Sequence, residues 1–328
     1  MPGVCADSTT GSFMTNTNTI KKGFSGTWPD LLTPVKSDLS IDTHRLETHI
    51  RTLLFKGVSG VVLFGHSGEG TLFSYTEKVE TLNGLIKAGI EPGSMMLSVT
   101  SNSVPDSVRL INLAEALELY GVLLSPPFYY KPVLSGGLTH YFEHLISHIK
   151  SPSTKLYIHL LPHITHLEIP EASLFAAIEQ WGAHIYGIVN QTGNNTVTDD
   201  LRKTFVDKVM IYSCKETDLK RLTPTGTISL MANLMPRVVT TILKGQQAMQ
   251  ISVIPGMKDR SSVDSRASEL QVLVAKYPSI SSLKFLLSLL YRDDEWRRTR
   301  PPLSPLDKAS CVVLEKEYKK FNLQPNEE

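Results

Sequence analysis

Short apolar runs alternate with amphipathic stretches along most of this chain, beginning near residue 24. Amphipathic helices are predicted between the runs, for example at residues 42–55, where leucines and Ile50 share one face and Asp42 is a suitable N-cap, and at 106–119. The runs are rich in leucine and β-branched residues, which is typical of buried strands. Eight runs are predicted strands: Trp28–Thr33, Gly60–Phe64, Met95–Thr100, Gly121–Ser125, Lys155–Leu161, His184–Val189, Lys208–Ser213 and Thr227–Met231.

This alternation predicts an α/β fold. Continuous apolar strands separated by helices indicate a parallel sheet that is covered by helices on its outer face. Eight such units within about 230 residues favour a closed (β/α)8 TIM barrel over an open sheet, and we place it at residues 24–255. Residues 256–328 predict a C-terminal helical subdomain, and the polar residues 1–23 a disordered tail. The helices expected in the C-terminal extension are 262–276, 280–291 and 305–321.

Composition narrows the class of protein without changing this fold. The 328 residues are 41% hydrophobic, and 33 lysines and arginines nearly balance 32 acids, for a net charge of +1. The chain is too apolar for intrinsic disorder, and it lacks the basic footprint of a general nucleic-acid-binding protein. Cys5, Cys214 and Cys311 show no CxxC spacing and are too few for a disulfide framework, which favours a reducing compartment.

The sequence shows no recognisable targeting signal and no recognisable membrane-spanning segment. Residues 1–23 lack the apolar core of a secretory signal, and no stretch of roughly 18 uncharged apolar residues predicts a transmembrane helix. We therefore expect a cytoplasmic protein that binds neither membranes nor nucleic acid. No GxGxxG follows the first predicted strand, which weakens a dinucleotide-binding alternative, and we expect no cofactor. No metal is expected either, because His159, His163 and His166 straddle Pro162 on a strand-to-loop turn without a metal-site spacing.

Polar and titratable residues gather where the predicted strands end. In a barrel of this class, the carboxyl ends of the strands carry the chemistry. Six such segments stand out: GHSGEG (65–70), SPPFYYKP (125–132), IHLLPHITH (158–166), GIVNQTGN (187–194), YSCKE (212–216) and ISLMAN (228–233).

Several of these segments resemble, in the same order, those of the dihydrodipicolinate synthase / N-acetylneuraminate lyase family. GHSGEG is similar to the family's GTTGE or GSTGE loop, SPPFYYKP to its PPYYNKP segment, and GIVNQTGN to its GIKEATGN without a gap. RPPLSPL at 300–306 is similar to its RLPMTPI. The resemblance runs from about residue 24 to 323 and implies a (β/α)8 barrel with a C-terminal helical extension. It also implies a lyase or aldolase in which a strand-six lysine forms a Schiff base with a 2-oxo acid, usually pyruvate.

The chain departs from the family at that lysine, which aligns with Val189. Valine has no nucleophile, and neither Ile188 nor Asn190 supplies an amine. Lys215 follows the seventh predicted strand and is therefore a candidate for a relocated amine, provided that a desolvated site lowers its pKa. The alternative is a lysine that faces solvent or pairs with Glu216.

Other positions of the family's site are retained in part. The first strand-two hydroxyl, which belongs to a proton relay in the family, aligns with His66. The hydroxyl that binds the substrate carboxylate is retained as Ser67, between Gly65 and Gly68. The relay tyrosine that reaches into a neighbouring subunit aligns with Tyr129, so the resemblance implies a homodimer or homotetramer.

The rest of the predicted site comes from strands five to eight. The tyrosine that protonates the family's intermediate aligns with His159, although Tyr157 lies on the same strand face and keeps the register open. His66 and His159 are a candidate acid–base pair near neutral pH. The alternative is that these two histidines only fill the space of the family's lost groups. Cys214 replaces a glycine that borders the pocket, and with Val189 and Ile228 it is assigned to substrate binding.

Two functions remain open at this stage. The first is a divergent enzyme that acts on a small 2-oxo acid or a related carboxylate through Ser67, Tyr129, His66 and His159. The second is a catalytically inactive homologue that binds a metabolite or a partner protein, as the loss of the lysine at Val189 suggests. Function has to be decided from the site itself, because one fold hosts many activities.

Overall fold

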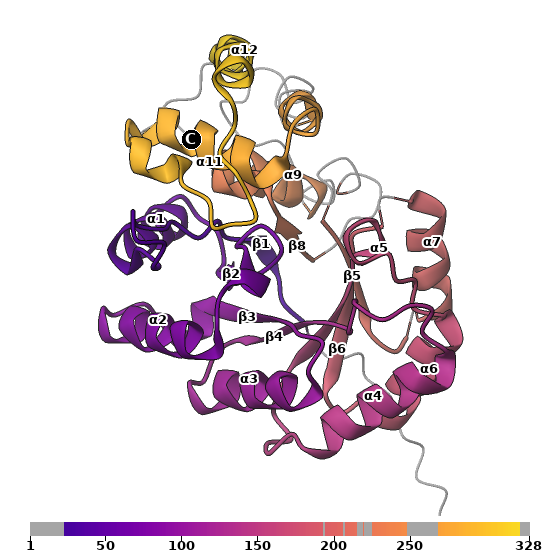
Figure 1. The fold of residues 1–328 in the computed structure, drawn as a ribbon. Coiled ribbons are helices and arrows are strands. Elements are labelled where there is room, and N and C mark those ends of the chain that lie inside the picture. The colour runs from indigo at the N-terminus through magenta and orange to yellow at the C-terminus, as the bar shows by residue number, and fades with distance from the viewer. Residues whose placement is uncertain are drawn as a thin grey trace, which may run out of the picture.

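The computed structural model describes residues 23–192, 194–205, 207–214, 219, 225–247 and 268–321. Within these residues, eight strands pair in parallel in the order β1-β8-β7-β6-β5-β4-β3-β2. They enclose the centre of the molecule, and helices surround them (Figure 1). The strands are Gly26–Pro29 (β1), Val61–Leu63 (β2), Met95–Thr100 (β3), Gly121–Ser125 (β4), Leu156–Leu160 (β5), Ile185–Asn190 (β6), Met210–Ser213 (β7) and Gly226–Ser229 (β8).

The helices alternate with the strands, as the hydrophobic pattern predicts. The helix expected at residues 42–55 is confirmed, and the carboxylate of Asp42 accepts a hydrogen bond from the backbone N–H of Arg45 (2.9 Å), which caps its first turn. The α-helices labelled in Figure 1 are Thr43–Phe55 (α1), Tyr75–Lys87 (α2), Val104–Ala116 (α3), Ser135–Ser147 (α4), Pro162–Thr165 (α5), Glu171–Trp181 (α6), Asn195–Thr204 (α7), Pro236–Gln247 (α9), Ser279–Tyr291 (α11) and Lys308–Tyr318 (α12).

The barrel is closed by few contacts between β1 and β2. The backbone N–H of Leu31 donates to the carbonyl oxygen of Val62 (2.9 Å), and Asp30 forms an isolated parallel bridge with Val62. The first strand was predicted at 28–33, but β1 ends at Pro29. Beyond Leu31 the chain leaves the sheet, because the backbone N–H of Leu32 donates to the side chain of Asn233 (3.1 Å) and not to a strand. Asp30 therefore lies at the seam of the barrel, just beyond a strand end.

Two separate apolar layers line the two faces of the strands. Residues that point outward pack against the surrounding helices in the largest core cluster. Because strand side chains alternate between faces, every second residue points into the barrel. These inward residues form a second cluster: Phe24, Trp28, Val62, Met96, Leu123, Tyr157, Val189, Tyr212, Cys214 and Ile228.

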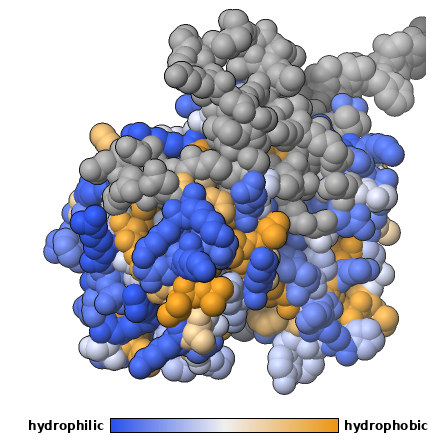
Figure 2. Space-filling view, turned by 90° about the horizontal axis from the view of Figure 1, so that it is seen from above, coloured by the Kyte–Doolittle hydropathy of each residue, from blue (hydrophilic) through white to orange (hydrophobic). Residues whose placement is uncertain are grey.

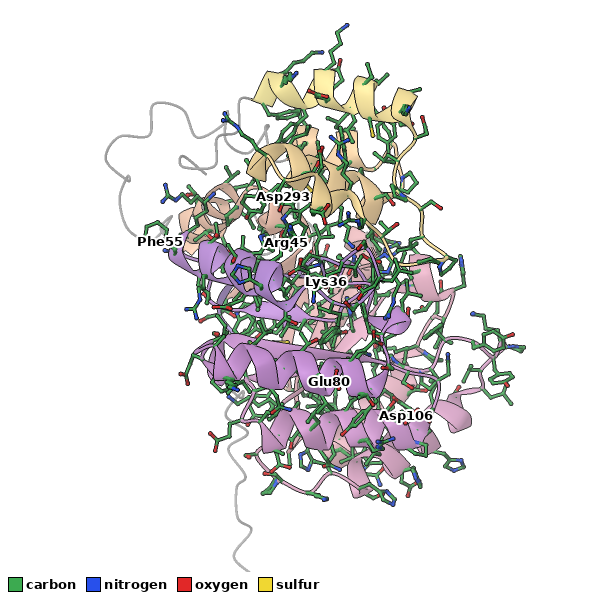
Figure 3. All side chains as sticks on the ribbon, turned by 60° about the vertical axis from the view of Figure 1, so that its left-hand side comes forward. Lys36, Arg45, Phe55, Glu80, Asp106 and Asp293 are labelled. Atoms are coloured by element: carbon green, nitrogen blue, oxygen red, sulfur yellow. The ribbon has the colours of Figure 1, made fainter. Side chains whose placement is uncertain are left out.

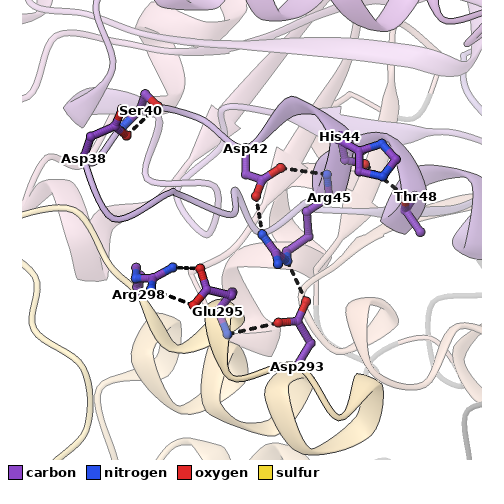
Figure 4. A network of polar contacts seen from close by, with 9 residues as sticks. All are labelled: Asp38, Ser40, Asp42, His44, Arg45, Thr48, Asp293, Glu295 and Arg298. Atoms are coloured by element: carbon purple, nitrogen blue, oxygen red, sulfur yellow. Dashed lines mark hydrogen bonds and ion pairs between the residues drawn. The ribbon is translucent and has the colours of Figure 1, made fainter.

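The C-terminal helices form a third cluster with α9, and they lie beside α1 and α9 at one side of the barrel (Figure 1). Arg45 of α1 and Asp293, which follows α11, face each other across this junction (Figure 3), and the Arg45 Nε donates to Asp293 (2.7 Å). The same arginine also pairs with Asp42, and Asp293 accepts from the N–H of Glu295 (3.1 Å; Figure 4). Charged contacts thus fix this part of the extension to the barrel.

The predicted (β/α)8 barrel with C-terminal helices is confirmed. The expected boundary between residues 255 and 256 lies outside the described residues, as do residues 1–22 of the expected tail.

Surface hydropathy and helix length are the two features that can be compared with those of membrane-spanning proteins. Seen from above Figure 1, hydrophobic residues form small separate groups between hydrophilic ones (Figure 2). No described helix is long and apolar enough to cross a membrane by itself. Residues 268–274 and 279–291 pass that test only as a pair, which is bent by 117°.

Candidate active site

The loop that follows β2 is built around the carboxylate of Asp30. Oδ2 of Asp30 accepts two hydrogen bonds from Ser67, one from its backbone N–H (3.0 Å) and one from its hydroxyl (2.6 Å). Both residues are buried, with exposed fractions of 6% and 2%. Since Trp28 belongs to the inner cluster and strand faces alternate, Asp30 is on the inward side, at the carboxyl end of β1.

Gly65 leaves the space that this carboxylate needs. A Cβ atom at Gly65 would collide with Oδ1 of Asp30, so any other residue would push the two segments apart. The hydroxyl of Thr33 also holds the loop, because it donates to the carbonyl oxygen of Gly68 (2.8 Å). The predicted residues Gly65, Ser67 and Gly68 are thus brought together, and their common neighbour is Asp30.

The electrostatic state of Asp30 is unusual for a carboxyl group. Burial raises its pKa above the ordinary value, while the two hydrogen bonds from Ser67 and the charge of the half-buried His66 oppose that rise. Its second oxygen, Oδ1, is buried and has no hydrogen-bond partner. A buried carboxyl with a raised pKa and one unused oxygen is suited to give or take a proton.

His159 is the second buried titratable group on the inner face. Its side chain is 2% exposed, and Nε2 lies 3.0 Å from Oε1 of Gln191. Burial lowers its pKa to about 3, and the charges of His66 and His163 act in the same direction. The ring is therefore neutral at pH 7. If Nε2 carries the hydrogen, as its contact with an amide oxygen requires, then the buried Nδ1 is an acceptor without a partner.

His66 connects these two groups electrostatically. Its charge lowers the pKa of both Asp30 and His159, which places the three side chains within one electrostatic environment. Asp30 therefore joins the predicted pair of His66 and His159 as a third titratable residue. Groups whose surroundings shift their pKa values in opposite directions are typical of acid–base sites.

Three residues assigned to substrate binding lie in a different setting. Val189, Cys214 and Ile228 belong to the apolar inner cluster and are buried. Tyr157 points the same way as His159 but lies two residues deeper, where its ring packs on Phe24 (5.2 Å between ring centroids). Val189 pairs in register with His159, so the apolar inner cluster extends up to the level of that polar side chain.

Tyr129, another predicted catalytic residue, is exposed rather than buried with these groups. Tyr129 is 71% exposed on the loop between β4 and α4, and its backbone N–H donates to the side chain of Asn102 (2.9 Å). Its ring contacts Tyr130 at 5.2 Å between centroids. Lys215 lies outside the described residues, so its predicted role stays a prediction.

Sequence reasoning missed Asp30. The signal was present, because an acidic residue directly follows an apolar run in TWPDLL and would point to the same side as Trp28. None of the eight described strands contains a lysine. The described residues also include no group of three or more His, Cys, Asp or Glu that could hold a metal ion.

A second buried carboxylate in the same loop is held differently. Glu69 forms an ion pair with Lys284 of α11, and both side chains are inaccessible to solvent. Oε2 of Glu69 accepts from the backbone N–H of Arg300 (2.8 Å), and the Arg300 guanidinium donates to the carbonyl oxygen of Leu72 (2.8 Å). Burial lowers the pKa of Lys284, while the charge of Glu69 opposes that shift. The C-terminal extension thus fixes the loop that carries Ser67.

Known proteins of similar sequence are aldolases and synthases by name. The chain is 23% identical over 280 residues to a 2-dehydro-3-deoxy-phosphogluconate/2-dehydro-3-deoxy-6-phosphogalactonate aldolase of Saccharolobus solfataricus, covering 84% of this chain and 89% of the relative. It is also 23% identical over 306 residues to a 4-hydroxy-tetrahydrodipicolinate synthase of Aliarcobacter butzleri, covering 89% and 98%.

Solved structures show the same architecture. The crystal structure of dihydrodipicolinate synthase from Agrobacterium tumefaciens matches with a TM-score of 0.81 and 25% identity, over 91% of this chain and 99% of that one. A model of the dihydrodipicolinate synthetase family matches residues 23–320, which include both the barrel and its C-terminal helices. The motifs at the strand ends, the barrel and the match over this whole length agree, and the chain belongs to the dihydrodipicolinate synthetase family.

Proposed function

We propose that this protein is a lyase of its family that acts on a small 2-oxo acid or a related carbonyl compound at the mouth of the barrel. Asp30, His66 and His159 move protons there, and no imine forms at position 189. Asp30 protonates or hydrogen-bonds the carbonyl oxygen, and Nδ1 of His159 accepts a proton or a hydrogen bond.

One observation carries this proposal. Two buried titratable groups near the strand ends, Asp30 and His159, each keep one polar atom without a partner, as does the phenol of Tyr157 deeper on the inner face. An unpaired buried polar atom costs folding free energy of about 1–3 kcal/mol, and these two belong to titratable groups at inward positions near strand ends, where barrels of this class carry their chemistry. The relatives named as aldolases for 2-dehydro-3-deoxy sugar acids supply the substrate class.

The surroundings of Val189 support the absence of an imine. Its side chain is fully buried within the apolar inner cluster, and its strand neighbours are His159 and Tyr212. Valine itself has no amine, and the described strands contain no lysine that replaces it, while Lys215 lies outside the described residues.

Proton exchange tests the proposal directly. The protein is incubated in D2O with pyruvate or with hydroxyacetone, and NMR follows the protons next to the carbonyl group. We expect exchange above the rate without protein for at least one of them, and we expect His159→Gln to reduce it at least tenfold. Borohydride treatment followed by intact mass should show no adduct. Absence of exchange with both compounds, or a borohydride adduct, would contradict the proposal.

A second function is favoured by one contact. Both donors of Ser67 are already used by Asp30, which is consistent with a homologue that binds a metabolite but does not turn it over. Thermal unfolding separates the two functions, because a ligand that binds only the native state raises the melting temperature even when no proton exchanges.

We also propose that Tyr129 lies in a subunit contact of a homodimer or homotetramer. A tyrosine that is 71% exposed and packed on Tyr130 at the tip of a loop is suited to bury its ring against another copy. Light scattering measures the mass in solution, and a monomer at micromolar concentration would refute this assembly.

A further inference from the structure

Ser67 and its loop form a site that binds a carboxylate, and the structure shows it in use. Its backbone N–H and its hydroxyl converge on the same oxygen, Oδ2 of Asp30, at 3.0 and 2.6 Å. Two donors aimed at one carboxylate oxygen in a buried place are a common way to hold an anion. We call these two donors the Ser67 seat.

The seat cannot serve two carboxylates at once. The amide and the hydroxyl each have one hydrogen to donate, and Asp30 uses both. A second carboxylate would also meet the charge of the first, because like charges within about 4–6 Å disfavour each other. The described group that opposes that charge is the half-buried His66.

The backbone is shaped to keep Asp30 in this place. Asp30 is held at the barrel seam by its bridge to Val62 and by the hydrogen bond of Asn233 to its carbonyl oxygen (2.9 Å). Gly65 leaves room for Oδ1, which any side chain at that position would displace. The carboxylate therefore belongs to the built structure of the mouth.

We propose that Asp30 is a specificity-determining residue: a built-in carboxylate that fills the Ser67 seat and excludes substrate carboxylates from it. The inference rests on the proposed function and narrows its substrate class. The preferred ligand presents a neutral carbonyl or hydroxyl group to Asp30, whose free Oδ1 can bond to it, and any carboxylate of that ligand lies away from Ser67.

The test measures binding of matched probes to the full-length protein by calorimetry. Acetate and pyruvate carry a carboxylate, whereas hydroxyacetone keeps the ketone of pyruvate and has CH2OH in place of the carboxylate. In Asp30→Ala the seat is empty, so we expect acetate and pyruvate to bind at least tenfold more tightly than to the unchanged protein. Hydroxyacetone should show no such gain. Asp106→Ala removes an exposed acid of α3 as the matched control and should change none of the affinities.

Further variants fix the interpretation. Ser67→Ala added to Asp30→Ala should abolish the gain for acetate, because the hydroxyl of the seat is then missing. If Asp30→Ala does not fold, Asp30→Asn keeps the shape without the charge, and we expect a smaller gain for carboxylates. Equal binding of pyruvate by the unchanged protein and by the folded Asp30 variant would overturn the inference, and so would a gain that survives Ser67→Ala.

These outcomes are distinct from those of the proposed function. The calorimetric gain reports only which groups occupy the seat, and it is expected even if no proton is transferred. Proton exchange in the unchanged protein reports the chemistry, and it can be present even if Asp30 does not compete with carboxylates. Each idea therefore fails on its own measurement.

Discussion

Glu69 and Asp30 are two buried carboxylates that contact the same loop, and they are compensated in opposite ways. Glu69 is 3% exposed and meets the ammonium group of Lys284 and the N–H of Arg300. Asp30 is 6% exposed, and among the contacts described its carboxylate accepts hydrogen bonds from the neutral donors of Ser67 and feels the charge of His66. The first carboxylate is paired with a basic side chain, whereas burial raises the pKa of the second.

The difference separates a structural charge from a functional one. A buried ion pair joins two parts of the chain and is broken at high cost when one partner is lost. A carboxyl group with a raised pKa and an unused oxygen adds little to folding, so its presence points to ligand chemistry. The Glu69 pair thus positions the loop, and Asp30 gives that loop its chemistry.

Breaking the ion pair is expected to have the largest effect on stability. Lys284→Met leaves Glu69 buried without its countercharge, so we expect the free energy of unfolding to fall by about 3–5 kcal/mol. Urea unfolding followed by circular dichroism measures the change. Lys276→Met, at an exposed lysine, is the matched control and should change stability by less than about 0.5 kcal/mol. Similar losses of stability in both variants would contradict the structural role of the ion pair between Glu69 and Lys284.

Acid is expected to act through the buried histidines. Burial lowers the pKa of His49 to about 4 and that of His159 to about 3, against an ordinary value of 6.5. Below pH ~6.5 the unfolded chain takes up protons that the folded protein does not, so stability falls as the pH drops. Each histidine accounts for about 1.4 kcal/mol per pH unit, or about 2 kcal/mol at pH ~5.

Urea unfolding at pH ~7 and ~5 measures this loss. The raised pKa of Asp30 acts with the opposite sign, because the folded protein holds that proton more readily than the unfolded chain, whose carboxyl has an ordinary value of 3.8. This gain comes only as the pH falls through the folded pKa of Asp30. His159→Gln should halve the acid-dependent loss, since one of two buried histidines is then gone. A stability that is flat between these pH values, both in the unchanged protein and in Asp30→Asn, would show that both rings are protonated in the folded protein.

Neutralising Asp30 is expected to have the smallest effect on stability. Because burial penalises its charged form, Asp30→Asn removes that penalty at pH 7 while an amide oxygen can still accept from Ser67. We expect the free energy of unfolding to stay within about 1 kcal/mol of its original value or to rise. Thermal unfolding measures it, and a loss as large as that of Lys284→Met would place both carboxylates in the same structural role.

The sequence by itself determined the architecture of this protein. Eight apolar runs separated by amphipathic helices are compatible with few folds, because each strand must be buried and each helix has one apolar face. The motifs GHSGEG, GIVNQTGN and RPPLSPL resemble those of the family to which the chain belongs. They also indicated Ser67, His66 and His159 as residues of the mouth, since strand ends of a barrel meet at one face.

Only the tertiary structure decided what those residues contact. Asp30 is 37 positions from Ser67 in the chain, and Glu69 is far from Lys284 on α11. Periodicity reports which face a residue occupies, but not which residue from a distant segment meets it. It also cannot show how far a carboxyl group is desolvated, because desolvation depends on the atoms of every segment packed around it. The role of Asp30 therefore arises from closing the barrel, which brings β1 against the loop after β2.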